Sequence, residues 1–181
     1  VSVQFMGGEP LLGFPLIKEI SEWMWENEFS KPYELFASTN GTLLNDEMKR
    51  WFSMNKDRIS LGLSFDGAPM AQDLNRTQSS RHNDFRFIRE TWPNMYVKMT
   101  VSVDTIKYLY DCVVFLEESG FQNIKTDLAY MRGWQTNHLR IWDEELKKLV
   151  TYYSDEEHDN HCSLLDTKIE AVFAKNVSVK R

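Results

Sequence analysis

A short apolar segment followed by a longer amphipathic one recurs five times along this chain of 181 residues, and this alternation constrains its fold more than any other feature. The apolar segments favour strands, and they comprise Val1–Met6, Pro32–Thr42, Ile59–Gly67, Met95–Val103 and Phe121–Tyr130. The amphipathic segments have helical periodicity, and we expect helices over Pro15–Phe29, Asp46–Phe52, Phe85–Trp92, Tyr108–Gly120 and Leu139–Glu157. Asn45 is expected to cap the second helix, and the polar stretch Ala68–Asp84 to form a loop.

Repeated strand-then-helix units of roughly 30 residues indicate parallel strands joined by crossover helices. Each predicted strand has buried-type sequence on both faces, which is typical of a parallel sheet with helices outside it. Such a sheet can curl into a barrel or be doubly wound. We favour an α/β fold with a partial (β/α) barrel of about five parallel strands, because Gly, Asn, Ser and Asp recur at the strand ends where such barrels bind ligands. The barrel is predicted to span residues 1–157, followed by a C-terminal extension over residues 158–181.

Composition excludes several classes of function. No apolar run approaches the roughly 20 residues of a membrane helix, so a membrane protein is not expected. The net charge is −6 and the basic residues are scattered, which argues against a nucleic-acid partner. The two cysteines lie 50 positions apart without CxxC spacing, and no secretion leader is recognisable, so we expect a cytoplasmic protein.

Polar and glycine residues cluster where the predicted strands end. Gly7-Gly8-Glu9-Pro10 follows the first strand and Asn40 the second, Ser64 and Asp66 end the third with Arg76 beyond, and Thr100 lies in the fourth. The ends of parallel barrel strands face one rim, so these side chains are expected to line one cavity. Glu9 suits an ammonium group and Arg76 a carboxylate, and together they would hold a zwitterionic amino-acid moiety.

Five segments in this order resemble core motifs of radical S-adenosylmethionine enzymes, in the peptide- and protein-modifying branch that includes the anaerobic sulfatase-maturating enzymes. They are "FMGGEPLL", "STNGTLLNDEMKRWF", "ISLGLSFDGAPMAQDLNR", "VKMTVSV" and "VVFLEESGFQNI". The resemblance implies that Gly7, Gly8, Glu9 and Pro10 bind the methionine amino group of S-adenosylmethionine. It implies that Ser64 and Arg76 contact its carboxylate and ribose region, while Asn40 and Thr100 are assigned to the cavity by position only.

The resemblance further implies that the complete enzyme reduces a [4Fe–4S] cluster with an external electron donor such as flavodoxin or ferredoxin. The cluster cleaves S-adenosylmethionine, and the resulting 5′-deoxyadenosyl radical abstracts hydrogen from a peptide or protein substrate. The family's Cys-x3-Cys-x2-Cys motif is absent from this sequence, and neither Cys112 nor Cys162 is expected to replace it. We therefore expect an excised middle piece of a longer oxidoreductase or peptide maturase, inactive by itself.

Other interpretations of the same residues remain open. Glu9 would be a solvated turn residue if its motif stood alone, Asp66 and Asn40 could merely shape turns, and Arg76 could belong to a surface ion pair of little energy. A metal site at His158, His161 and Cys162 is less expected than a solvated loop. The chain could also be a non-catalytic barrel that binds a peptide or nucleotide, or an aldolase-type barrel with Lys98 or Lys125 as its Schiff-base lysine.

Overall fold

The computed structural model describes residues 1–76, 79–81, 85–130, 133–155 and 160–166, and contains one six-stranded parallel sheet. Its strands are β1 (Ser2–Phe5), β2 (Glu34–Thr39), β3 (Ile59–Ser64), β4 (Val97–Val101), β5 (Asn123–Leu128) and β6 (His161–Cys162). The helices are α1 (Phe14–Glu26), α2 (Asp46–Met54), α3 (Pro69–Asn75), α4 (Phe85–Thr91), α5 (Leu109–Glu118) and α6 (Thr136–Asp155), with 3₁₀ turns η1 (Pro10–Gly13) and η2 (Ile106–Tyr108).

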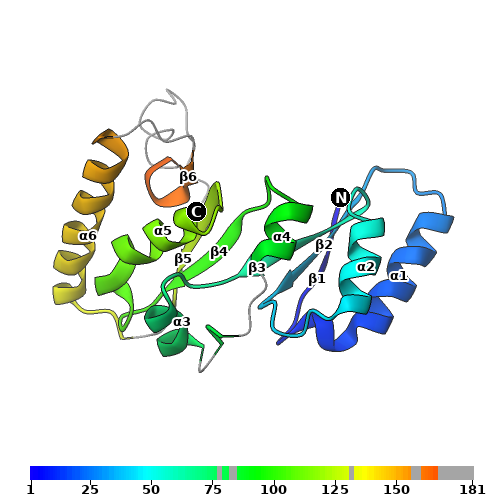
Figure 1. The fold of residues 1–181 in the computed structure, drawn as a ribbon, viewed down its shortest axis with the longest axis horizontal. Helices are drawn as coiled ribbons and strands as arrows, with labels where there is room; N and C mark the ends of the chain where they lie inside the picture. The colour runs from blue at the N-terminus through cyan, green and yellow to red at the C-terminus, as the bar shows by residue number, and fades with distance from the viewer. Residues whose placement is uncertain (77–78, 82–84, 131–132, 156–159, 167–181) are drawn as a thin grey trace.

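The strands are hydrogen-bonded in chain order, from β1 to β6, and every pair is parallel. A doubly wound sheet would reverse its strand order at a switch point, so this topology is the barrel type that the sequence favoured. β1 and β6 lie at the two edges of the described sheet, which is therefore open. Figure 1 shows the resulting elongated arc, with β1 and α1 at one end and β5 and α6 at the other.

Two elements differ from the sequence prediction. The stretch predicted as a polar loop contains α3, which begins at Pro69 and is tied to the end of β3 because the Gln72 side chain accepts a hydrogen bond from the Asp66 amide at 2.6 Å. The short strand β6 pairs with β5 and brings the strand number to six rather than about five. It lies in the segment assigned to the C-terminal extension, most of which falls outside the described residues, so the boundary at residue 157 stays a prediction.

The prediction that every strand is apolar on both faces is wrong. Along β2, β3 and β4 the residues alternate between buried and partly exposed, except that Gly62 is also buried. The buried hydrophobic residues pack with α1, α2, α4 and α5 in the main core, and they are Leu35, Ala37, Ile59, Leu61, Leu63, Val97, Met99 and Val101. The opposite face carries Phe36, Ser38, Ser60, Ser64, Lys98 and Thr100. The helices therefore cover one face of the sheet, and the other face is polar.

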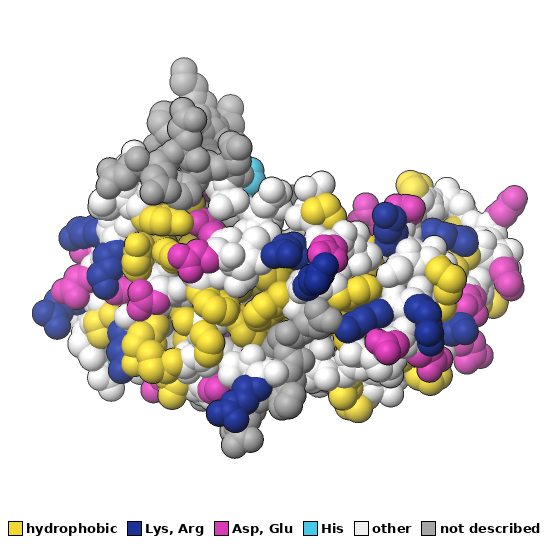
Figure 2. All heavy atoms as spheres, in the orientation of Figure 1, with side chains coloured by type: hydrophobic (Ala, Val, Ile, Leu, Met, Phe, Trp, Pro, Cys, Tyr) yellow, Lys and Arg dark blue, Asp and Glu magenta, His cyan; other side chains and the backbone are white. Residues whose placement is uncertain are grey.

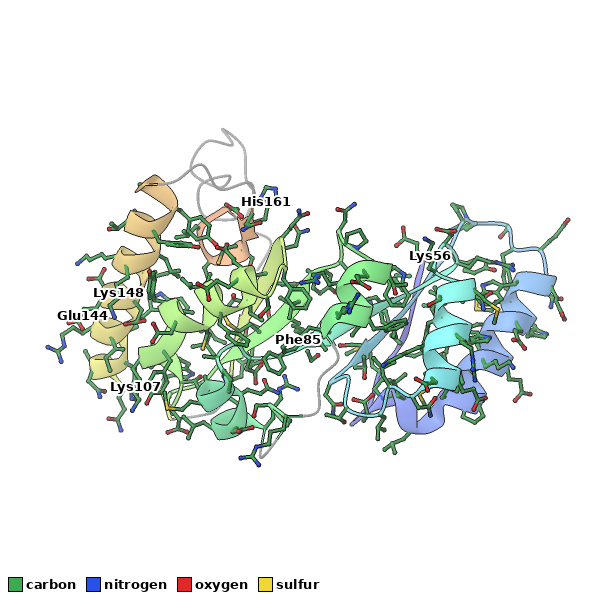
Figure 3. The ribbon with its side chains drawn as sticks, viewed as in Figure 1. Lys56, Phe85, Lys107, Glu144, Lys148 and His161 are labelled. Atoms are coloured by element: carbon green, nitrogen blue, oxygen red, sulfur yellow. The ribbon has the colours of Figure 1, made fainter. Side chains whose placement is uncertain are left out.

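Aromatic side chains fix the helices on the apolar face. Phe52 of α2 is fully buried, and its ring lies 5.8 Å from Phe14 of α1 and 6.1 Å from Trp92 after α4. Phe85, labelled in Figure 3, begins α4 and packs edge-on against Phe65 beyond β3, with ring centroids 4.5 Å apart. At the N-terminus of α2 the Asn45 side chain accepts a hydrogen bond from the Met48 amide at 2.9 Å, which confirms the predicted cap.

Candidate functional site

A polar cavity of about 210 Å³ lies at the carboxyl ends of β1, β2, β3 and β4. Its lining comprises Met6, Gly7, Gly8, Glu9, Ser38, Asn40, Ser64, Arg76, Lys98 and Thr100. All the predicted binding residues are thus brought together except Pro10, which begins η1 and is not among the described residues that line the cavity. Sequence reasoning missed Met6, which directly precedes the Gly-Gly turn, and the strand residues Ser38 and Lys98. The period of two along a strand could have indicated Ser38 and Lys98, because it places them on the same face of the sheet as Ser64. In the structure Ser38 hydrogen-bonds to Ser64, and Lys98 is the register partner of Ser64.

Glu9 holds the turn after β1 against the end of β2. Its carboxylate accepts hydrogen bonds from the Thr39 hydroxyl at 2.7 Å, the Asn40 amide at 2.9 Å and the Leu11 amide at 3.1 Å. The alternative of a merely solvated glutamate is therefore wrong. A carboxylate offers about four lone-pair sites, so these three donors leave room for one more. Glu9 can accept a hydrogen bond from a ligand while the protein fixes its orientation.

The Gly7-Gly8 turn leaves open space beside Glu9. Gly7 has a φ of +153°, which side-chain-bearing residues rarely adopt. At both glycines no described heavy atom lies within 4 Å of the place where a Cβ would stand. A ligand can therefore approach the backbone of this turn closely, as the Gly-Gly sequence predicted.

Asp66 joins three segments beneath the cavity. Its side chain is 1% exposed and accepts hydrogen bonds from Arg76 Nε at 2.8 Å and Nη2 at 3.2 Å, from Asn75 Nδ2 at 3.2 Å and from the Thr100 amide at 2.8 Å. The weak surface pair considered for Arg76 is thus wrong, because one partner is buried and the contact is bidentate. Two guanidinium nitrogens face Asp66, and Nη1 is not used by this pair.

Asn40 mainly shapes its own turn, as one of the alternatives held. Its side-chain oxygen accepts hydrogen bonds from the Thr42 amide at 2.9 Å and the Thr42 hydroxyl at 2.7 Å. Lys98 approaches the cavity from β4, and its ammonium lies 3.1 Å from Asp127 Oδ2 of β5. The cavity therefore has one carboxylate wall at Glu9 and two cations, Arg76 and Lys98.

Two larger cavities lie away from these residues. One, of about 1030 Å³, is an apolar groove between β5 and α6 lined by Leu128, Trp134, Leu139 and Trp142 among others. Another, of about 550 Å³, lies at the amino ends of β1, β2 and β3. Barrels of parallel strands bind ligands at the carboxyl ends of their strands, where the small polar cavity lies and where Glu9, Arg76 and Lys98 line it. We therefore take it as the candidate site.

Comparison with known proteins places the fold. No family model matches the sequence. MJ0907 of Methanocaldococcus jannaschii, an uncharacterized protein, is 25% identical over 162 residues, which cover 83% of this chain and 54% of that protein. Polyhistidine-tagged anSMEcpe with bound AdoMet superposes with a TM-score of 0.76 at 18% identity, and native anSMEcpe with bound AdoMet and Cp18Cys peptide with 0.76 at 17%. This chain has the fold of an anaerobic sulfatase-maturating enzyme.

The match extends over 98% of this chain and 53% to 54% of each anSMEcpe chain. The chain thus spans about half the length of the relatives it matches. The fold is the radical S-adenosylmethionine type of partial barrel, in agreement with the resemblance that the sequence motifs indicated. In the anSMEcpe structures AdoMet is bound, and in two of them a peptide as well.

The cysteines of this chain do not fit the [4Fe–4S] cluster of radical S-adenosylmethionine enzymes. Burial raises the pKa of the Cys112 thiol to about 12 and that of Cys162 to about 11, so both stay protonated at neutral pH. Cys112 packs closely beneath Gly67. A Cβ atom added at Gly67 would lie 2.3 Å from the Cβ atom of Cys112. Among the described residues, no group of three or more His, Cys, Asp or Glu side chains could hold a metal ion.

The metal site considered near the C-terminus is not formed by the two of its residues that the structure describes, His161 and Cys162. His161 and Cys162 belong to strand β6 rather than a solvated loop, and neighbouring side chains of a strand point to opposite faces. Cys162 is buried, while the side chain of His161, labelled in Figure 3, is 73% exposed. His158 lies outside the described residues.

On the face shown in Figure 2, Lys and Arg side chains are interspersed with Asp and Glu rather than gathered in a basic stripe. In the part of the chain that is described, every helix is too short or too polar to cross a membrane.

Proposed function

We propose that this chain forms the S-adenosylmethionine-binding part of a radical S-adenosylmethionine enzyme that modifies a peptide or protein. The observation that carries the proposal is the convergence of Gly7, Gly8, Glu9, Ser64 and Arg76 on one polar cavity. These residues lie in two separate motifs, and the sequence resemblance assigns both motifs to one ligand. A turn or a surface ion pair would not require them to meet.

Different residues of the cavity contact the positively and the negatively charged groups of the ligand. Glu9 accepts a hydrogen bond from the methionine ammonium group at its remaining lone-pair site, since its other acceptor sites are used by β2 and η1. The bare backbone of Gly7 and Gly8 allows the methionine moiety to lie against the turn. Ser64 and Arg76 contact the carboxylate and ribose region, Asn40 and Thr100 form the wall, and Pro10 fixes the start of η1.

The remaining parts of the reaction come from outside this chain. A [4Fe–4S] cluster would supply the reducing chemistry for cleavage of S-adenosylmethionine, and its ligands would have to come from outside this chain, whose two cysteines are buried. An external electron donor such as flavodoxin or ferredoxin would be its reductant, and we assign the complete enzyme to the oxidoreductase and peptide-maturase class. The peptide bound in anSMEcpe supports a peptide or protein substrate. We place the enzyme in the cytoplasm, because its thiols are free and buried.

Anaerobic reconstitution of the full-length protein tests this proposal. The protein is supplied with iron and sulfide, reduced, and given S-adenosylmethionine, and 5′-deoxyadenosine is measured by mass spectrometry. We expect 5′-deoxyadenosine from the wild-type protein and much less from Glu9→Gln, which keeps the shape of the side chain but removes its charge. Finding neither an iron–sulfur absorbance nor 5′-deoxyadenosine contradicts the proposal.

A second candidate function follows from the same cysteine count. A barrel that bound a peptide or nucleotide without chemistry would need no thiolates, and both thiols here are buried and protonated. The parental open reading frame separates the two candidates. Three cysteines at x3, x2 spacing favour the enzyme, and a frame without them favours the binding module.

A further inference from the structure

The candidate cavity contains two cations whose partners differ. Arg76, reached after α3, faces Asp66, and Lys98 of β4 faces Asp127 of β5. The sequence pointed to Arg76 for the ligand's carboxylate and gave Lys98 a role only in the aldolase-type alternative, as a Schiff-base candidate. The two ion pairs show which cation is able to change partner.

Arg76 is committed to the protein. Asp66 is buried, and it uses both carboxylate oxygens on the Arg76 guanidinium while it also holds the Thr100 amide. Drawing the guanidinium away to a ligand carboxylate would leave a buried anion without its countercharge, which is strongly unfavourable. Arg76 therefore offers a ligand only the N–H groups that Asp66 does not use, on Nη1 and the outer side of Nη2, and these suit a neutral hydroxyl acceptor as well as an anion.

Lys98 is free to exchange its partner. The Lys98 side chain is 40% exposed and that of Asp127 44%, so water screens the pair and solvates whichever group is released. Asp127 can turn to solvent at little cost when another carboxylate approaches the ammonium. Lys98 is also the register partner of Ser64, so both residues stand side by side on the polar face of the sheet.

We infer that Lys98 is the residue that binds the carboxylate of the methionine moiety, with Ser64 beside it, while Arg76 serves the ribose region. This inference rests on the proposed binding of S-adenosylmethionine in this cavity. The amino and carboxylate groups of an amino acid share one carbon atom, so their binding groups must lie close together. Glu9, Ser64 and Lys98 meet this condition, since all three line the same 210 Å³ cavity.

The test compares two ligands and two lysines. Binding of S-adenosylmethionine and of its decarboxylated analogue, which lacks only the carboxylate, is measured by calorimetry on the full-length protein. Lys98→Met removes the charge and keeps much of the side-chain length. The matched control is Lys125→Met, because Lys125 is the register partner of Lys98 on β5, lies over the Tyr96 ring at 5.4 Å and is not among the described residues that line the cavity.

We expect Lys98→Met to weaken S-adenosylmethionine binding by roughly tenfold to a hundredfold, the value of a charged hydrogen bond. The decarboxylated analogue should bind to Lys98→Met and to wild type with affinities within about threefold of each other, and Lys125→Met should change neither affinity by more than that.

Three results would overturn the inference in distinguishable ways. An unchanged S-adenosylmethionine affinity in Lys98→Met shows that Lys98 makes no contact with the carboxylate. An equal loss of affinity for both ligands means that Lys98 acts on another part of the molecule. If the wild-type protein binds neither ligand, the proposed function itself fails, and the role of Lys98 fails with it.

Discussion

The two faces of the sheet are built from alternate residues of the same strands, yet one face forms the core and the other lines the candidate site. On the helix-covered face, Leu61, Val97 and Met99 are completely buried. On the other face, Ser64, Lys98 and Thr100 of the same or neighbouring strands remain partly exposed and line a cavity. The period of two along each strand separates stability from binding. Substitutions on the apolar face should therefore unfold the protein, and those on the polar face should weaken its ligand.

The largest difference in stability is expected between two phenylalanines that lie on opposite faces of the sheet. Phe52→Ala empties a fully buried position and should lower the free energy of unfolding by about 3–5 kcal/mol. Phe36, on the polar face over Gly62, is only half-buried, so Phe36→Ala should cost about 1 kcal/mol. Urea denaturation of both variants measures the difference. Equal losses would mean that the two faces contribute alike to the core.

The two cations of the cavity provide the next comparison. Arg76→Met leaves Asp66 buried without its countercharge and should cost about 3 kcal/mol of stability. Lys98→Met breaks a half-exposed pair and should cost less than about 1 kcal/mol. Thermal unfolding of both variants at the same pH tests this order. A larger loss for Lys98→Met than for Arg76→Met contradicts the view that only Arg76 is fixed by the fold.

A serine pair on β3 tests whether the polar face contributes to binding with only a small effect on stability. Ser64→Ala removes a hydroxyl from the cavity and should weaken S-adenosylmethionine binding by about tenfold, with about 1 kcal/mol or less of stability lost. Ser60→Ala is the control, because Ser60 lies on the same face of the same strand and is not among the described residues lining this cavity. Equal affinities of the two variants would remove Ser64 from the site.

The smallest effect is expected at the cysteines. Since burial holds the thiol pKa of Cys112 at about 12 and of Cys162 at about 11, the reactive thiolate is scarce at pH 8. Native protein should therefore resist iodoacetamide at pH 8, and unfolding in urea should make both thiols reactive. Because both pKa values are raised in the folded state, labelling of native protein should begin only as the pH rises toward them. Rapid labelling of Cys112 at pH 8 would contradict its packing beneath Gly67.

Most of the fold could be predicted because its signals are local. Five strand-and-helix units carry their own periodicity, and the Asn45 cap is contained in a few neighbouring residues. The missed elements depend on distant partners. Helix α3 is supported by Gln72 bonding to the Asp66 amide, and β6 has only two residues and exists through its pairing with β5.

The candidate site was predicted residue by residue only where a motif marked it. Gly7, Gly8 and Glu9 were found because they form a recognisable group, and the structure adds that Glu9 is fixed by β2. Lys98 lies in a segment whose sequence predicts a strand that is apolar on both faces. That assumption holds for sheets covered by helices on both sides, and here one face is left polar. The buried partner of Arg76 also needed the structure, because nothing in the sequence indicates that Asp66 is shielded from water.

The most direct test of the central claim is a crystal structure of the full-length protein with S-adenosylmethionine. The account predicts that the methionine moiety lies in the cavity between the Gly7-Gly8-Glu9 turn and Ser64, with its ammonium group at Glu9. Density for the ligand in the apolar groove between β5 and α6 instead, with the polar cavity left to water, would contradict it.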